Sequence, residues 1–155
     1  MATPPFPQPL EQLLLQTRRA HLATADAPGD PHVVPVVFVY VGGDLYIPID
    51  AKPKSVAQRR LKRIRNLREN PRAALLIDHY DEDWSRLGFL LIHAAAEIAP
   101  LADCSPAVGE ALRRKYPHYR QPAMLPAEAL VVRLRPRRYH AWGVFAQPEE
   151  RQRPT

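Results

Sequence analysis

Short apolar runs separated by glycine- and proline-containing turns dominate this sequence, and that pattern predicts a protein built mainly of β-strands. The run Val33–Tyr40 is so apolar that we expect both of its faces to be covered. Gly42–Asp44 is typical of a tight hairpin turn that joins it to the next strand. The strands predicted in this way lie at residues 21–25, 32–41, 45–50, 73–80, 87–98, 129–134 and 139–145.

Helical periodicity is limited to a few segments. Leu10, Leu13, Leu14 and Thr17 recur at the spacing of one helix face, which predicts a helix over residues 10–20. A second helix is expected over residues 55–69, ended by the Asn-Pro pair at 70–71, and a short one within residues 100–115. No repeat or long linker interrupts the pattern. We therefore expect a single domain over residues 1–155, a closed or nearly closed antiparallel barrel with helices, with a proline-rich, loosely structured tail at 1–9 and a C-terminal tail at 147–155.

Charge adds a specific feature to this picture. The formal net charge is +6, and the segment Ala51–Arg68 contains eight basic residues and no acidic one. Such a segment suits nucleic acid, an anionic membrane surface or a phosphorylated small molecule. No aromatic residue interleaves with it, which argues against nucleic acid. The basic residues are Lys52, Lys54, Arg59, Arg60, Lys62, Arg63, Arg65 and Arg68.

The sequence contains no sign of a membrane span, a signal peptide or an intramolecular disulfide. No apolar run approaches the length of a transmembrane helix, so we expect no membrane span. The N-terminus lacks the basic and apolar regions of a signal peptide, and the single cysteine, Cys104, cannot form an intramolecular disulfide. A cytoplasmic location is the resulting expectation.

The start of the basic segment is a candidate phosphate site. Lys52, Lys54 and Ser55 follow a predicted strand and lead into the basic helix, whose N-terminus offers free N–H groups. The alternative, a basic helix face that only contacts solvent, stays open from spacing alone. No glycine-rich nucleotide motif is present, which argues against a nucleoside triphosphate.

Two other clusters contain side chains that can carry chemistry. In a strand ending near residue 80, Asp78 and His79 point to opposite faces, so the cluster running to Trp84 does not converge on a metal, and we expect no metal site. Trp142, beside two arginines and a glycine, could cover a planar ligand, although from the sequence alone an aromatic core anchor in the final strand is the better explanation. No catalytic side chain stands out, and the sequence assigns no role to Asp78, His79 or Trp84.

The order of these pieces resembles the pyridoxamine 5′-phosphate oxidase-like superfamily of split-barrel flavoproteins. The resemblance lies in the strand Pro31–Phe38, the glycine hairpin, the Lys-Pro-Lys-Ser run at 52–55 and, most specifically, the run Asn-Leu-x-x-Asn-Pro-Arg at 66–72. The segment Asp78–Arg86 is similar to a subgroup of probable coenzyme F420-dependent enzymes. The chain lacks the C-terminal arginine motif and the Ser-Arg-Lys phosphate run of true pyridoxamine phosphate oxidases, which argues against that substrate.

The resemblance implies a six-stranded antiparallel split β-barrel of Greek-key, flavin-reductase-like type, and a homodimer with cofactor sites at the subunit interface. It implies an oxidoreductase that moves a hydride between F420, or alternatively FMN, and a small planar or conjugated substrate. A non-catalytic carrier of flavin, deazaflavin or haem is the second possibility. Trp142 would lie near the partner subunit's site. The residues implied to bind the cofactor are Val34, Pro35 and Val36 along the ring, Lys52, Lys54, Ser55, Lys62 and Arg63 around the phosphate, and Ile49 and Asp50 at the end of the preceding strand.

Overall fold

The computed structural model describes residues 1–49 and 61–146. Within these ranges the helices are α1 (Gln8–Gln16), α2 (Lys62–Glu69) and α3 (Pro106–Lys115). The strands are β1 (Ala20–Ala25), β2 (Pro31–Val36), β3 (Val39–Val41), β4 (Asp44–Pro48), β5 (Arg72–His79), β6 (Gly88–Pro100) and β7 (Leu130–Gly143). No helix in these ranges is both long enough and apolar enough to span a bilayer.

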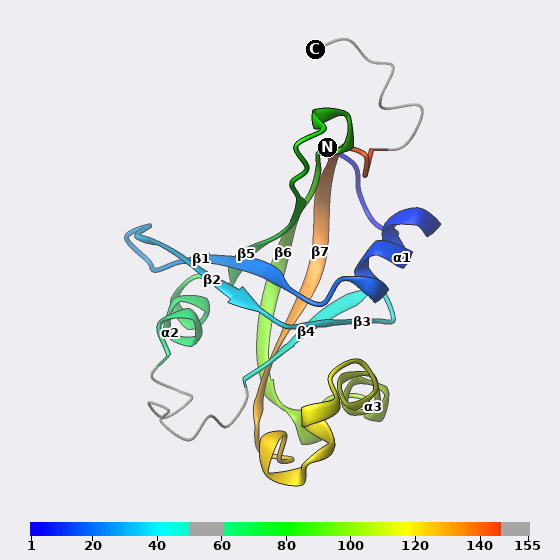
Figure 1. Ribbon diagram of the computed structural model, residues 1–155. Helices are drawn as coiled ribbons and strands as arrows, with labels where there is room; N and C mark the ends of the chain where they lie inside the picture. Colours follow the sequence, from blue (N-terminus) through cyan, green and yellow to red (C-terminus); the bar gives the residue numbers. More distant parts are fainter. Residues whose placement is uncertain (50–60, 147–155) are drawn as a thin grey trace.

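All the described strands form one antiparallel sheet in the order β2-β1-β5-β6-β7-β4-β3 (Figure 1). The two end strands, β2 and β3, are separated in the chain by only Val37 and Phe38, so the sheet has to curl until its ends approach each other. The predicted fold, a mainly β antiparallel split barrel with helices, is therefore confirmed. The described sheet has seven strands rather than six.

The predicted strand over residues 32–41 is divided at Phe38. Its backbone N–H donates to the hydroxyl of Tyr116 at 3.1 Å, and its carbonyl lies 2.9 Å from the same hydroxyl. A side chain thus takes the backbone groups that a neighbouring strand would otherwise pair. The run consequently gives two short edge strands, β2 and β3.

The two predicted strands near the C-terminus are one continuous strand, β7. A β-bulge explains why they looked separate: His93 of β6 pairs with Arg138, whereas Ala94 pairs with Pro136, so Arg137 is extra. Because of this extra residue, the inward positions change from even numbers, such as Leu134, to odd numbers, such as Tyr139. The alternation of apolar residues therefore breaks in the middle of an unbroken strand.

The basic helix begins later than predicted. Leu61, the residue before α2, has an extended backbone with φ −59° and ψ 134°, so the helical geometry starts at Lys62 rather than at Ser55. Residues 50–60 lie outside the described part of the chain. The first helix also ends earlier than predicted, at Gln16, because β1 begins at Ala20.

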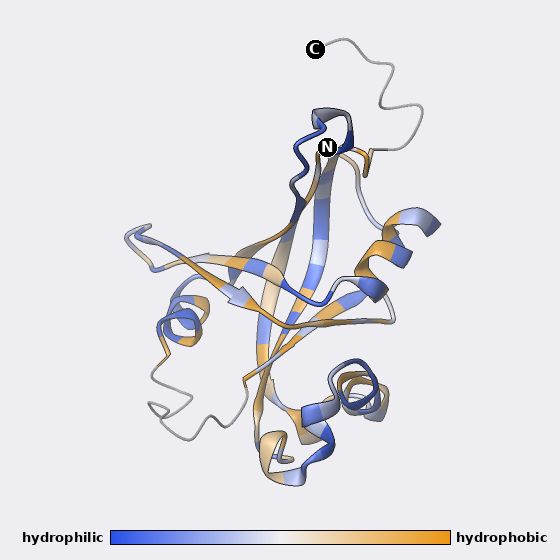
Figure 2. Ribbon diagram, viewed as in Figure 1, coloured by the Kyte–Doolittle hydropathy of each residue, from blue (hydrophilic) through white to orange (hydrophobic). Residues whose placement is uncertain are grey.

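Two hydrophobic cores lie on opposite sides of the curled sheet. The main core fills the barrel and includes Leu22, Leu75 and Ile92, with α1 and α2 packed against it. The second core lies between α3 and the outer side of β3, β4 and β7, and includes Leu112 and Tyr119. Figure 2 shows apolar residues along the central strands, while the tip of the β5–β6 hairpin is hydrophilic.

The proline-rich start of the chain is not loosely structured, contrary to the prediction. Ala2 and Tyr139 exchange two backbone hydrogen bonds, of 2.9 and 2.8 Å. Phe6 is 4% exposed, and its ring packs 4.9 Å from that of Tyr139 and 5.9 Å from that of Tyr40. An aromatic anchor therefore outweighs the proline content of this segment.

One sheet surface stays partly open within the described chain. We call it the outer face, and it consists of the side chains of β1, β2, β5, β6 and β7 that point away from the main core. It contains Val33, which is 61% exposed, and Trp142, which is 46% exposed and stacks on Phe89 at 5.7 Å. The prediction that both faces of the Val33–Tyr40 run would be covered is therefore wrong for β2 in the single chain.

Candidate functional site

An open cleft of about 330 Å³ lies where β2, the end of β4, α2 and the segment after α3 meet. Its apolar surface comes from the β2 end and the start of the β2–β3 connection, from Pro48, which ends β4, and from Tyr119. The side chains of Val36, Pro48 and Tyr119 are buried, so these walls are fixed by packing. The β2 side of the cleft is formed by Pro35, Val36 and Val37.

The strand that lines the cleft is an edge strand. β2 pairs with β1 on one side only, and no described strand pairs with its other side. An edge strand presents backbone N–H and C=O groups to whatever lies beside it. Proline is tolerated at such an edge, and β2 contains two prolines, Pro31 and Pro35. The edge can therefore hydrogen-bond the polar rim of a planar ligand.

The first wall of the cleft is α2, which brings Arg63 to it. Asn66, 1% exposed, donates its side-chain amide to the hydroxyl of Thr24 on β1 at 3.1 Å. Lys62 donates to the carboxylate of Asp26 at 3.1 Å, and Glu69 accepts the backbone N–H of Ala27 at 3.0 Å. Three polar contacts thus fix the helix against β1 and the β1–β2 turn.

The second wall follows α3 and contains the 3₁₀ turn η4 (Pro117–Arg120) with His118 and Tyr119. Tyr116, immediately before it, is 3% exposed, and its hydroxyl lies 2.8 Å from the carbonyl of Arg18 as well as against the backbone of Phe38. Burial raises the pKa of Tyr116 above its ordinary value, so the hydroxyl keeps its proton. One side chain therefore links the second wall to the two connections that flank the cleft, α1–β1 and β2–β3.

The cleft is basic. Arg19, Arg63 and His118 line it, and no carboxylate does so among the described residues. Arg19 is exposed and makes no hydrogen bond or ion pair with any described residue. The imidazole of His118 stacks on Tyr119 with ring centroids 4.1 Å apart, while its nitrogens have no hydrogen-bond partner in residues 1–49 and 61–146. The site therefore suits an anionic ligand with a planar part.

The structure places the predicted site residues unequally. Pro35, Val36 and Arg63 line the cleft, with Val34 on the same strand. Ile49 follows Pro48, and its backbone N–H donates to Leu130 at 2.8 Å, so it fixes the cleft's β4 edge. Asp50, Lys52, Lys54 and Ser55 lie outside the described residues.

Lys62 and Trp142 lie away from the cleft lining. Lys62 is paired with Asp26 of the β1–β2 turn, and Trp142 stacks on Phe89 on the outer face. Gly143, which follows Trp142, has φ +64°, and an added Cβ would lie 2.0 Å from the carbonyl oxygen of Leu87. Only glycine permits this close approach to Leu87, and the approach fixes the direction of the backbone just after Trp142.

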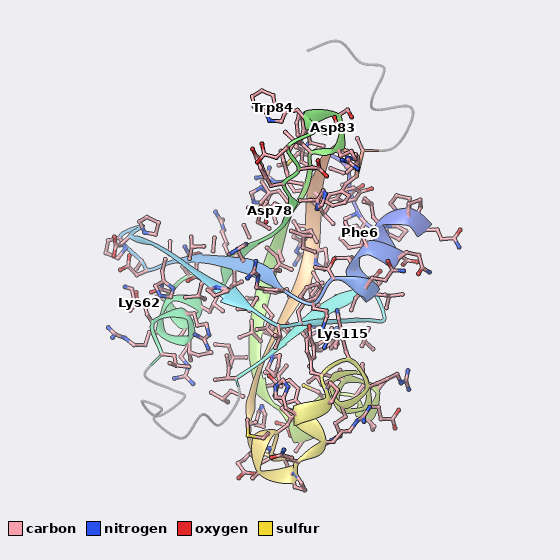
Figure 3. The ribbon with its side chains drawn as sticks, viewed as in Figure 1. Phe6, Lys62, Asp78, Asp83, Trp84 and Lys115 are labelled. Carbon is pink, nitrogen blue, oxygen red and sulfur yellow. The ribbon has the colours of Figure 1, made fainter. Side chains whose placement is uncertain are left out.

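The cluster from Asp78 to Trp84 is a structured hairpin end. Trp84 and Asp83 lie at the tip between β5 and β6, far from α2 and Lys62 (Figure 3). Asp83 accepts from the backbone N–H and the hydroxyl of Ser85 at 3.0 and 2.7 Å, and Trp84 is 74% exposed. Within the described residues, no group of three or more histidine, cysteine or carboxylate side chains could hold a metal ion.

Sequence reasoning missed Arg19, His118 and Tyr119. Arg19 and His118 are 99 positions apart in the chain, and only the curled sheet and the Tyr116 contacts bring them to one cleft. The only sequence signal that pointed to these residues was their position: Arg19 directly precedes a strand, and His118 and Tyr119 directly follow a helix.

The strand order and the curled sheet define a split-barrel protein, and the cleft at its β2 edge is where such a barrel meets α2. The sequence profile of the pyridoxamine 5′-phosphate oxidase family matches residues 6–143, and the chain belongs to this family. The expected family is thereby confirmed. None of the curated proteins compared with the chain matches it significantly.

Several solved structures share the fold. A conserved hypothetical protein, Rv2991 from Mycobacterium tuberculosis, has a TM-score of 0.67 at 22% identity and covers 91% of this chain and 86% of its own. HutZ, the haem storage protein from Vibrio cholerae, has a TM-score of 0.65 at 19% identity, covering 92% and 95%. An F420 reductase has a TM-score of 0.61 at 22% identity, covering 87% and 98%. At these identities the likeness concerns the fold alone.

Proposed function

We propose that this protein is an oxidoreductase that transfers a hydride between F420, bound in the cleft, and a small planar or conjugated substrate. FMN is the alternative cofactor. The observation that supports the proposal is the combination of an edge strand with a basic wall: Pro35–Val37 offers backbone groups and apolar surface, and Arg63 offers a cation beside it. The family match and the solved F420 reductase with the same fold are consistent with it.

The chain's own residues fit such a cofactor. The edge of β2 can hydrogen-bond the ring's polar rim, and the apolar walls exclude water from one of its faces. Arg63 can make a charge-assisted contact with the phosphate, and the predicted ligands Lys52, Lys54 and Ser55 would follow Ile49 toward the same group. The cofactor itself carries the hydride, so the protein has to supply binding and orientation rather than an acid or base.

We further propose that the protein acts as a homodimer. The outer face adjoins the cleft through β2 and contains the exposed Val33 and Trp142. Its partly buried neighbours Leu76, Leu91 and Phe89 extend the apolar area. A second copy on this face would cover it and would bring an aromatic side chain toward its partner's cofactor.

The test is a fluorescence titration of the purified protein with F420, FMN and riboflavin, comparing wild type with Arg63→Met. Arg65→Met is the matched control, because Arg65 is exposed on the same helix and does not line the cleft. Loss of one charge-assisted phosphate contact should weaken F420 or FMN binding by about 10- to 150-fold. Riboflavin, which lacks the phosphate, should bind both proteins alike. If F420 and FMN fail to bind wild type, the proposed function is wrong.

A haem carrier is the second candidate, and a specific observation favours testing it. His21, His93 and His140 all project from the outer face, as their pairing with Leu76, Arg138 and Leu91 shows. The solved haem storage protein has the same fold. A strong Soret band after haemin addition that is lost in a His21→Ala, His93→Ala and His140→Ala variant would support haem binding at this face.

A further inference from the structure

We infer that a second cavity, between α1, β3 and α3, binds a small organic anion with an apolar body, of the class of aromatic or short aliphatic monocarboxylates. This inference goes beyond the proposed function, because the cavity and the cofactor cleft have no described lining residue in common. The cavity is lined by Leu15, Val39, Tyr40, Ala111, Arg114 and Lys115.

The cavity lies where two helices pack on the same edge strand. Both α1 and α3 contact β3, and Lys115 lies between them (Figure 3). Leu15, Val39 and Ala111 give it an apolar wall from each of the three elements. Its volume is about 230 Å³. Since a water molecule takes about 30 Å³ of the liquid, the cavity has room for a molecule of roughly the size of benzoate or hexanoate.

The polar part of the lining is cationic. Arg114 and Lys115 belong to the last turn of α3, and no described lining residue is acidic. The carboxylate of Glu11 approaches from α1 but already accepts the hydroxyl of Tyr40 at 2.9 Å. Arg114 is exposed and makes no hydrogen bond or ion pair with a described residue. A carboxylate in the cavity would therefore meet one unpaired guanidinium and one ammonium group.

The surroundings of Lys115 are the main support for an anion. Its ammonium donates to the carbonyl of Leu14 at 3.2 Å and lies 4.3 Å from the centre of the Phe38 ring. An ammonium has three N–H donors, and the Leu14 carbonyl is their one hydrogen-bond acceptor among residues 1–49 and 61–146. Burial and the nearby Arg18 both lower its pKa, which means that its positive charge is poorly compensated. A bound carboxylate would supply the missing counter-charge.

The position of these cations at a helix end does not by itself account for the site. Basic residues are favoured at the C-terminus of any helix, and the last turn of α3 contains Arg113 as well. Arg113, however, lies beside Glu110 in a different surface depression. Arg114 and Lys115 differ from it because they line a cavity whose other walls are largely apolar. That combination of an apolar wall and cations suits an amphipathic anion.

The experiment is a ¹⁹F NMR titration of the protein with 4-fluorobenzoate, and with 4-fluorobenzyl alcohol as a neutral probe of the same size. The variants are Leu15→Glu, Leu15→Gln and Lys115→Met. Leu15 is 49% exposed, so its two substitutions should leave the fold intact even if Lys115→Met does not. Arg113→Gln is the control, because it removes a positive charge from the same helical turn outside this cavity.

We expect wild type to bind 4-fluorobenzoate with a Kd near or below about 1 mM, which a ligand of this size can reach. The alcohol should bind at least about tenfold more weakly, because it makes no charge-assisted contact. Leu15→Glu, which adds a like charge, and Lys115→Met should each weaken binding of the acid by at least about tenfold. Leu15→Gln and Arg113→Gln should stay within about threefold of wild type.

The outcomes decide the inference without any cofactor being present. Equal affinity of wild type for the acid and the alcohol would overturn it, and so would equal affinity of wild type and Leu15→Glu for the acid. If binding of the acid persists in Leu15→Glu but is lost in Arg19→Gln, the acid binds in the cofactor cleft and the second site does not exist. None of these results bears on the proposed function, which the F420 and FMN titrations test separately.

Discussion

The two walls of the cleft are held in different ways. The α2 wall combines the packing of Ile64 and Leu67 in the main core with polar contacts. Of these contacts, Asn66 is buried against Thr24, and Lys62 is paired with Asp26 at the surface. The wall after α3 depends on the second hydrophobic core and on the single hydroxyl of Tyr116. Both walls are packed, but the α2 wall adds a buried hydrogen bond between two side chains. Removing Asn66 should therefore disturb it more than removing the Tyr116 hydroxyl disturbs the wall after α3.

The largest effect is expected from Asn66→Ala. The change removes a buried hydrogen bond to Thr24 and leaves a small cavity beneath α2, which should cost about 2–4 kcal/mol of unfolding free energy. Chemical denaturation followed by circular dichroism measures it, with the exposed Arg65→Ala as control. Cofactor affinity should fall as well, because Arg63 loses its support. A loss below about 0.5 kcal/mol would show that the pair does not hold the wall.

Tyr116→Phe should have a smaller effect on stability, about 1–3 kcal/mol, because the ring stays packed while the backbone N–H of Phe38 loses its partner. Tyr46→Phe is the matched control. Tyr46 belongs to the same core, and its hydroxyl makes no hydrogen bond with residues 1–49 and 61–146. If both variants lose equal stability, burial of the rings rather than the hydroxyl contact accounts for the result.

Lys115 gives the second wall a pH dependence. Its ammonium group lies 4.3 Å from the centre of the Phe38 ring and donates to the carbonyl of Leu14 at 3.2 Å, and burial lowers its pKa to about 8 (Figure 3). Between pH 8 and 10 the unfolded chain keeps this proton while the folded protein releases it, so this group makes stability rise with pH. Denaturation midpoints at pH 8 and pH 10 should show a smaller rise in Lys115→Met than in wild type. An equal rise in both proteins would contradict the assignment.

The smallest effect is expected from Lys62→Met, which breaks the surface ion pair with Asp26. Hydrogen bonds from the backbone of Asp30 and from Lys62 lower the pKa of Asp26, so its contribution to stability is present at neutral pH and lost as the pH falls below 3.8. Thermal melts at low and high salt should show a small loss for the variant that disappears with salt. A loss as large as that of Asn66→Ala would mean that Lys62 has a further structural role.

Some of the residues that line this cleft could be predicted from the sequence, and the others could not. Pro35, Val36 and Arg63 line the cleft and are expected from the family resemblance, which rests on local runs of residues. The break at Phe38 could not be predicted, because its cause, Tyr116, is 78 positions away. The Asn-Leu-x-x-Asn-Pro-Arg run was recognised as specific, but its physical reason, the bond between Asn66 and Thr24, spans 42 positions. Arg19 and His118 were missed for the same reason: their proximity is a property of the fold rather than of any local pattern.

The bulge at Arg137 has a consequence for how this chain can change in length. Deleting that one residue would leave Pro136 opposite Ala94 and Arg138 opposite His93, so the rest of β7 would keep its pairing, and Tyr139 and Ala141 would still point into the barrel. The residue itself is exposed and could be exchanged for almost any other at little cost. Position 137 is thus tolerant of both substitution and deletion, because the extra residue adds a local bend to β7 and does not decide which of the strand's other side chains point inward.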